Sequence, residues 1–115
     1  YAGPQASAAD NIDKLLTALD GVPEDRRGAR FVAVIVFLRD ADDPLPIIAE
    51  GQWQGRILQQ PRGTEGFGYD PVFEDIELGL AAAELPAAIK DRRSHRGLAL
   101  AALRRSLEAL RVETP

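Results

Sequence analysis

The run FVAVIVFL at residues 31–38 constrains the fold of this chain more than any other stretch. It is continuously apolar and rich in β-branched side chains, which is typical of a strand covered on both faces or central in a mixed sheet. Turn residues follow at 40–44, and the segment LPIIAEGQWQGRI at 45–57 is long enough to return as an antiparallel strand. The sequence therefore predicts a β-hairpin. Its Trp53 fits a core position better than a ligand platform.

Helical patterns flank this hairpin on both sides in the sequence. Residues 7–19 carry apolar side chains at i, i+3, i+4 and i+7, with Ser7 or Asp10 as the N-cap. The stretch LAAAELPAAIK at 80–90 favours helix, and Ser94 is placed to cap a last helix. That helix has leucines at spacings of three, four and three: Leu100, Leu103, Leu107 and Leu110. The order α, β, β, loop, α, α predicts an α/β or α+β domain, while the charges of the connection at 21–30 are expected to be solvated.

Composition excludes several functional classes. The 115 residues suffice for one domain, and no apolar run approaches the roughly 20 residues that span a bilayer. Without cysteine, and with His95 as its single histidine, the chain offers neither disulfides nor a His or Cys metal cluster, so any metal would sit on carboxylates. A net charge of -4 argues against nucleic-acid binding. The chain opens at Tyr1 and has no methionine, so residues before Tyr1 are expected to be missing.

The stretch GTEGFGYDP at 63–71 is an unusual loop because three glycines stand beside aromatic residues and a carboxylate. The glycine spacing is neither a dinucleotide fingerprint nor a P-loop, and on spacing alone a plain turn is the better interpretation. Asp70 precedes proline, which partly fixes its direction, and Phe67 offers a flat stacking face nearby. Such a pair suits a heterocycle with N–H donors. The alternative is that Phe67, Tyr69 and Phe73 pack while Asp70 caps a turn.

A second candidate binding site is the basic stretch KDRRSHRG at 90–97. If Ser94 caps the last helix, His95 and Arg96 occupy its first turn, where backbone N–H groups and the helix dipole favour anions and carbonyl oxygens. Cations at this end oppose the dipole, so stability alone does not select them, and a binding role is favoured. The alternative is a solvated basic patch, which fits best the two arginines that precede Ser94.

These two stretches resemble the inosine/xanthosine triphosphate pyrophosphatase family, the Ham1-like enzymes that remove non-standard nucleotides. FGYDPVF at 67–73 and SHRGLALAAL at 94–103 are the most specific matches. Other segments are similar to the family in the same order along nearly the whole chain: YAG at 1–3, N-x-x-x-LL at 11–16, VP at 22–23, GARF at 28–31, G-x-W-x-G at 51–55 and AAEL at 82–85.

The resemblance implies an α/β fold, an elongated mixed sheet flanked by helices, in which residues 1–115 are the C-terminal part of a single nucleoside-triphosphate pyrophosphatase domain. It implies hydrolysis of inosine, deoxyinosine and xanthosine triphosphates (ITP, dITP and XTP) to the monophosphate and pyrophosphate, with Mg²⁺ as cofactor. A cytoplasmic homodimer is implied as well. Carried over residue by residue, the substrate-binding positions are Phe67, Gly68, Tyr69, Asp70, Lys90, His95 and Arg96. They are expected to form two walls of a purine pocket.

The chain also departs from the family pattern. Family members carry a Thr/Ser-x-Asn-x-x-Lys motif that grips the triphosphate, an acidic metal ligand, and an Asp-Asp-Ser-Gly segment with the catalytic aspartate. None of these motifs occurs in this sequence. We therefore expect the catalytic residues upstream of Tyr1, the fold to be incomplete without that part, and no metal ligands here, since the acids at 42–43 and 74–77 are expected to be solvated. A non-catalytic nucleotide-binding or subunit-interaction module is the alternative.

Overall fold

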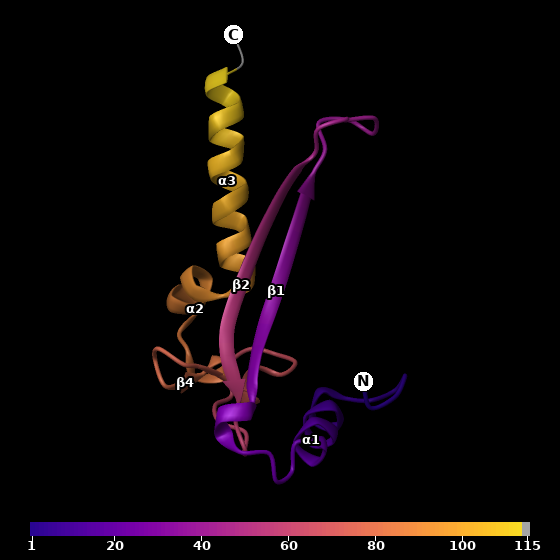
Figure 1. Cartoon of the computed structure of the whole chain (residues 1–115), viewed down its shortest axis with the longest axis vertical. Helices are drawn as coiled ribbons and strands as arrows, with labels where there is room; N and C mark the ends of the chain where they lie inside the picture. The colour runs from indigo at the N-terminus through magenta and orange to yellow at the C-terminus, as the bar shows by residue number, and fades with distance from the viewer. Residues whose placement is uncertain (114–115) are drawn as a thin grey trace. The chain divides into compact units, whose positions relative to one another are not determined.

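The computed structural model describes residues 1–113, with side chains through Leu110. The main elements are a short N-terminal helix, a long β-hairpin and two consecutive helices at the end of the chain (Figure 1). The helices are α1 (Ala8–Ala18), α2 (Ala87–Arg93) and α3 (His95–Glu113), and the strands are β1 (Gly28–Phe37), β2 (Ile47–Ile57), β3 (Phe73–Asp75) and β4 (Leu80–Ala81). Single 3-10 turns lie at Glu24–Arg26, Asp70–Val72 and Ala82–Glu84.

The strands form one sheet in the order β1-β2-β3-β4. β2 pairs antiparallel with β3, with Ile57 opposite Phe73, and β3 pairs antiparallel with β4, with Glu74 opposite Ala81. The predicted hairpin is confirmed, and β1 is the terminal strand of the sheet over the described residues. No helix in this part of the chain has the length and apolar character needed to cross a membrane.

The chain divides into two compact units. The first comprises residues 1–30 and 54–86, and the second comprises residues 31–53 and the chain from Ala87 onward. β1 and β2 each contribute residues to both units.

Helix α1 of the first unit begins as the sequence predicts. The Ser7 hydroxyl accepts a hydrogen bond from the Asp10 amide at 3.1 Å, and the Asp10 carboxylate accepts one from the Ser7 amide at 3.0 Å. This reciprocal capping box satisfies two of the amides that a helix start leaves unpaired. Of the two predicted caps, Ser7 is therefore the N-cap, and Ile12 on the next turn is buried.

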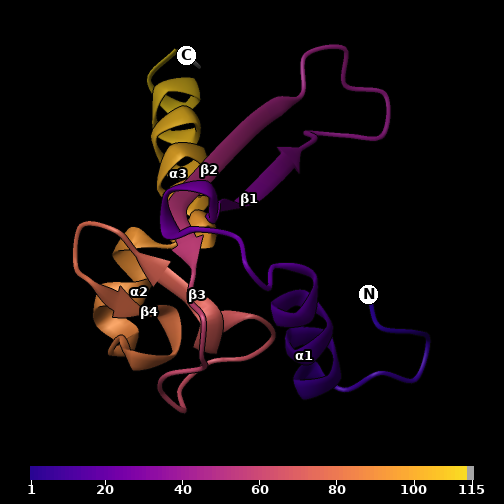
Figure 2. The same cartoon turned by 60° about the horizontal axis from the view of Figure 1, so that its bottom comes forward.

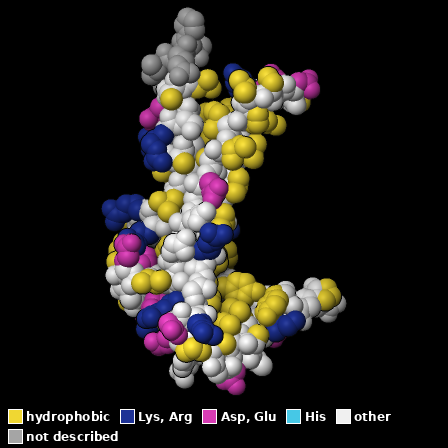
Figure 3. Space-filling view, in the orientation of Figure 1, with side chains coloured by type: hydrophobic (Ala, Val, Ile, Leu, Met, Phe, Trp, Pro, Cys, Tyr) yellow, Lys and Arg dark blue, Asp and Glu magenta, His cyan; other side chains and the backbone are white. Residues whose placement is uncertain are grey.

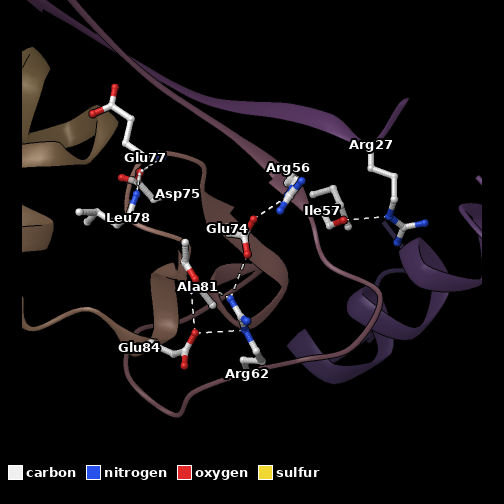
Figure 4. A network of polar contacts seen from close by, with 11 residues as sticks. Arg27, Arg56, Ile57, Arg62, Glu74, Asp75, Glu77, Leu78, Ala81 and Glu84 are labelled. Carbon is white, nitrogen blue, oxygen red and sulfur yellow. Dashed lines mark hydrogen bonds and ion pairs between the residues drawn. The ribbon is translucent and has the colours of Figure 1, made fainter. Parts of the chain in front are cut away.

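Arg27 contradicts the expectation that the charges at 21–30 are solvated, because only 4% of it is exposed. Its Nε donates to the Ile57 carbonyl at 2.8 Å, Nη1 donates to Leu19 at 2.8 Å, and Nη2 donates to Leu58 at 3.0 Å. The guanidinium thus joins the end of α1 to the end of β2, and its fixed donor fork makes burial tolerable. Figure 4 shows its bond to Ile57.

The helix predicted over 80–90 is wrong in its first half. Leu80 and Ala81 pair with β3, and a 3-10 turn follows before helix α2 begins after Pro86. The Ala81 amide donates to the Glu84 carboxylate at 2.8 Å, which fixes this turn. Leu85 is extended, as expected for a residue that precedes proline, so the helix cannot extend backward through it.

The second unit contains the outer part of the hairpin and the last two helices. Along β1, odd-numbered residues are half-buried while Val32, Val34 and Val36 are 47%, 56% and 56% exposed. The expectation that this strand is covered on both faces is therefore wrong for the described residues. The first turn of α3 lies against β2 (Figure 1 and Figure 2), and Phe31 on the half-buried face of β1 stacks on His95 of that turn. A contact with the helix thus covers the half-buried face of β1 at Phe31.

Candidate functional site

The glycine loop, residues 63–70, is shaped by backbone conformations that other residues avoid. Gly63, Gly66 and Gly68 have φ values of 86°, 93° and 60°, a region that L side chains seldom adopt. The loop is anchored by the Glu65 amide, which donates to the Ala83 carbonyl at 2.9 Å. Its glycines are therefore required by local geometry, which explains their density in the sequence.

Asp70 closes the glycine loop from inside. Its carboxylate accepts from the Phe67 amide at 3.1 Å, the Asp70 amide donates back to the Phe67 carbonyl at 3.2 Å, and Asp70 is only 7% exposed. Phe67 is 66% exposed, whereas Phe73 is buried in the core. Gly68 and Tyr69 are half-buried. The alternative to a binding site is that the aromatic residues pack and Asp70 caps a turn. The structure confirms this for Asp70 and Phe73, whereas Phe67 lies at the surface.

The basic corner, residues 90–97, is a break between two helices. The Ser94 amide donates to the Lys90 carbonyl at 2.8 Å as α2 ends, and the Ser94 hydroxyl accepts from the Gly97 amide at 3.1 Å as α3 begins. The second of these bonds confirms Ser94 as the predicted N-cap, and Ser94 is buried. The three predicted binding side chains of the second group all lie in this corner. Lys90 and His95 are half-buried, and Arg96 is exposed.

Two glycines let the backbone approach the basic corner closely. A Cβ at Gly97 would lie 1.7 Å from the Asp91 carbonyl oxygen, and a Cβ at Gly51 of β2 would lie 2.0 Å from the His95 carbonyl oxygen. Neither glycine has a positive φ. Space, not conformation, therefore selects glycine at both positions.

An aromatic cluster holds the His95 ring. The His95 and Phe31 rings are stacked with centroids 4.8 Å apart and 19° between their planes, and the Trp53 centroid is 6.4 Å from that of His95. Trp53 is 4% exposed, which confirms it as core. Sequence reasoning missed this cluster, because nothing in the spacing of residues 31, 53 and 95 connects them. The orientation of the imidazole is therefore set by packing against two strands.

An ion-pair network surrounds a buried glutamate, Glu74, in the first unit (Figure 4). Glu74 is 5% exposed and accepts from Arg56 on one carboxylate oxygen and from Arg62 on the other, the latter at 3.1 Å. Arg62 also pairs with Glu84 at 3.2 Å. Glu74 was expected to be solvated, and this is wrong: it is held by two arginines that extend from the end of β2 and the segment after it.

The remaining acids near these elements also have structural partners. The buried Asp75 accepts from the Glu77 and Leu78 amides at 3.0 and 3.1 Å, so it is not solvated either. In the hairpin turn, hydrogen bonds from the Arg39 side chain and from backbone amides hold the pKa of the Asp43 carboxyl well below its usual range. No group of three or more acidic or histidine side chains placed for a metal occurs within the described part of the chain.

The predicted site residues thus fall into two groups. The first unit contains Phe67, Gly68, Tyr69 and Asp70, and the second contains Lys90, His95 and Arg96. Within each group the residues lie on one loop or one helix break. Their roles in binding stay a prediction.

Comparisons with known proteins identify relatives over nearly the whole chain. The sequence profile of the Ham1 family matches residues 1–106. The chain is 61% identical over 110 residues to a dITP/XTP pyrophosphatase of Methylococcus capsulatus and 50% identical over 112 residues to one of Vibrio cholerae, covering 96% and 97% of this chain. The chain spans 55% and 56% of the length of these two relatives.

Solved structures give the same result for the fold. A HAM1 protein of Coxiella burnetii superimposes with a TM-score of 0.88 at 42% identity, covering 95% of this chain and 55% of that one. A nucleoside-triphosphatase / dITP/XTP pyrophosphatase of Mycobacterium abscessus gives 0.73 at 42% identity, covering 89% of this chain and 51% of that one. The predicted α/β class with helices flanking a sheet is confirmed, and the strand pairs β2–β3 and β3–β4 are antiparallel.

Proposed function

Because this chain belongs to the Ham1 family, we propose that it is the base-recognising part of a nucleoside-triphosphate pyrophosphatase. The substrates are non-standard purine nucleotides, ITP, dITP and XTP, which the whole enzyme hydrolyses to the monophosphate and pyrophosphate and so removes from the nucleotide pool. The observation that carries this proposal is the 61% identity, over 96% of the chain, to a relative described as a dITP/XTP pyrophosphatase.

The glycine loop contributes a stacking surface and an acceptor. Phe67 is exposed on a loop whose conformation is fixed by its glycines, so its ring is available to a planar base with little ordering to be done on binding. The Asp70 carboxylate has acceptor sites on two oxygens, and Oδ2 already accepts from the Phe67 amide. We assign Asp70 both the closure of the loop and acceptance of a hydrogen bond from a ring N–H.

The basic corner contributes donors. Lys90, His95 and Arg96 can donate to the 6-oxo group of hypoxanthine or xanthine, whereas adenine presents an amino donor at that position. Donors facing a donor stay unpaired, which costs about 1 to 3 kcal/mol for a buried group. Stacking on Phe31 fixes the His95 ring plane before the substrate arrives. This polarity explains discrimination against adenine nucleotides.

Magnesium, which the family resemblance implies, does not find a ligand set among the residues that the structure describes. Glu74, Asp75 and Asp43 are hydrogen-bonded within the fold, and no cluster of three acids stands among the described residues. We therefore place the metal ligands and the catalytic carboxylate in the part of the relatives that this chain does not match, and we expect residues 1–115 alone to release no pyrophosphate. A cytoplasmic homodimer is the assembly that the resemblance implies.

The test uses this chain joined to the unmatched part of the Methylococcus relative. Pyrophosphate release from ITP and from ATP is measured for the fused protein and for Arg96→Ala. If Arg96 recognises the 6-oxo group, kcat/KM for ITP falls by about 5- to 150-fold, corresponding to about 1 to 3 kcal/mol, and ATP loses less. Arg104→Ala, on an exposed turn of the same helix, is the control and leaves both unchanged. Equal losses for ITP and ATP would exclude base recognition by Arg96.

A further inference from the structure

Arg62 lies at the base of the glycine loop, where the two ends of the loop meet. Its amide donates to the Pro71 carbonyl at 2.8 Å, so the residues just before and just after the loop are joined directly. The second half of the loop is closed by the bond from the Phe67 amide to Asp70. The position of the first half, residues 63–66, depends on the segment that this half contacts.

The first half of the loop rests on the 3-10 turn at Ala82–Glu84. The Glu65 amide donates to the Ala83 carbonyl at 2.9 Å, and a Cβ at Gly63 would lie only 2.5 Å from the same carbonyl oxygen. Two residues of the loop thus contact one carbonyl group. A shift of this turn would therefore shift the loop.

The Arg62 side chain joins this turn to the sheet. Its Nε pairs with Glu84 in the turn at 3.2 Å, and its Nη2 donates to Glu74 of β3 at 3.1 Å. Nη2 also donates at 3.2 Å to the carbonyl of Gly79, which lies between β3 and β4. Figure 4 shows the guanidinium between the two carboxylates, and the Glu84 oxygen that it contacts also accepts from the Ala81 amide. One side chain thus holds the base of the loop against β3, the segment before β4 and the turn after it.

These ion pairs are expected to contribute little to overall stability. The side chains of Arg62 and Glu84 are 42% and 30% exposed, so water screens their attraction. Figure 3 accordingly shows acidic and basic side chains intermingled at the surface around β4. The buried Glu74 keeps Arg56 as a partner when Arg62 is removed. Loss of Arg62 should therefore leave the fold intact while it loosens the turn and the loop.

We propose that Arg62 is a positioning residue for substrate binding, acting through the 3-10 turn and the glycine loop on Phe67 and Asp70. This role rests on the proposed function, in which these two residues contact the purine base. Arg62 itself donates from Nε and Nη2 to groups of the protein, so its effect on the base is indirect. A loop already held in its binding conformation has less freedom to lose when the substrate binds. Removal of Arg62 should thus raise KM and leave kcat nearly unchanged.

Arg62→Ala and Arg56→Ala in the fused protein form a matched pair. The two arginines pair with the same buried carboxylate and are 42% and 40% exposed, but Arg56 lies on β2, outside the loop and the turn. KM for ITP should rise about fivefold or more in Arg62→Ala, with kcat within about twofold of the parent protein, and should stay unchanged in Arg56→Ala. Equal changes of KM in the two variants would overturn the proposal.

Arg62→Lys separates charge from geometry. Lysine keeps the charge, but a single ammonium replaces the planar fork that contacts two carboxylates from two nitrogens. KM for ITP should therefore lie between that of the parent protein and that of Arg62→Ala. Circular dichroism follows folding in all three variants. Unfolding of Arg62→Ala while Arg56→Ala stays folded would assign Arg62 a structural role and overturn the proposal.

Hydrogen exchange measures the loop without any substrate. The Glu65 and Phe67 amides are bonded to the Ala83 carbonyl and the Asp70 carboxylate. In Arg62→Ala both amides should exchange about tenfold faster than in the parent protein, because the loop opens more often. In Arg56→Ala they should keep the parent rates.

The two measurements together distinguish the ways in which the proposal can fail. Unchanged exchange with a raised KM would mean that Arg62 contacts the substrate directly, and no change in either would mean that it does not anchor the loop. Both results overturn the proposal. Faster exchange with an unchanged KM would show that the loop does not bind the base, which contradicts the proposed function and this role with it. A parent fused protein that neither binds nor hydrolyses ITP would do the same.

Discussion

Gly68 of the glycine loop and Gly97 of the basic corner are both positions that require glycine, but for different physical reasons. Gly68 in the loop has a φ of 60° and open space where a Cβ would be. Gly97 in the corner has no positive φ, yet a Cβ there would lie 1.7 Å from the Asp91 carbonyl oxygen. Gly68 is therefore selected by its backbone conformation and leaves room for a side chain, whereas Gly97 is selected by lack of space and not by its conformation.

This difference separates how the two groups of predicted binding residues are held. Phe67 is presented by a loop closed through its own hydrogen bonds, chiefly that from its amide to Asp70. His95 is presented by close packing, with its carbonyl against Gly51 and its ring on Phe31. Substitutions in the loop should therefore have local effects of moderate size, and substitutions at the corner should disturb the packing of the second unit.

The largest expected effect is that of Gly97→Ala. The new methyl group collides with the backbone of Asp91, which cannot move aside like a flexible side chain, so α2 and α3 must separate. We expect a loss of about 3 kcal/mol in the free energy of unfolding, measured by urea denaturation followed by circular dichroism. Gly28→Ala is the matched control, since a Cβ there meets nothing within 4 Å and should have little effect. Equal stability of the two variants would show that the corner is not held by packing.

Asp70→Ala should have the next largest effect. It leaves the Phe67 amide without the carboxylate oxygen that now accepts its hydrogen bond at 3.1 Å, at a position only 7% exposed. The expected loss is about 1 to 3 kcal/mol in unfolding free energy. Asp70→Asn keeps an acceptor oxygen and should recover most of that loss. If both variants lose the same stability, the charge and not the hydrogen bond closes the loop.

The parts of the fold that sequence predicted correctly are those encoded by neighbouring residues. The sequence predicts Ser94 as one N-cap and Ser7 or Asp10 as the other, because a helix start needs an acceptor beside its unpaired amides. The hairpin followed from an apolar run, a turn and a second run within 27 residues, 31–57. Neighbouring residues likewise indicate the glycine loop and the basic corner as candidate sites.

The parts that sequence could not predict depend on partners far along the chain. From the sequence, Arg27 is expected at the surface. In the fold it is buried because it donates to the carbonyls of Leu19, Ile57 and Leu58. Likewise, Glu74 is buried because Arg56 and Arg62 converge on it. The apolar sequence of a strand such as β1 predicts that its faces are covered. It does not show whether residues of the same chain cover one face or both.

Gly68→Ala tests the effect of backbone conformation separately from the effect of space. No atom lies within 4 Å of the added Cβ, so the whole effect comes from holding a non-glycine residue at a φ of 60°. Left-handed backbone costs about 1 to 2 kcal/mol for such a residue, and we expect a loss near the lower value. Gly68→Asn should lose less, because asparagine tolerates this region better. A loss as large as that of Gly97→Ala would remove the distinction between the two glycines.

Phe67→Leu should have the smallest effect on stability. Phe67 is 66% exposed, and its ring is not part of the core, so the change in unfolding free energy should stay within about 0.5 kcal/mol. Phe73→Leu is the matched control: Phe73 is 1% exposed, and loss of its ring should destabilise the first unit by about 1 to 3 kcal/mol through the cavity left behind. In the fused protein, Phe67→Leu should nonetheless raise KM for ITP, because leucine offers no flat face to the base. An unchanged KM together with a lowered melting temperature would move Phe67 from the binding surface to the packing of the loop.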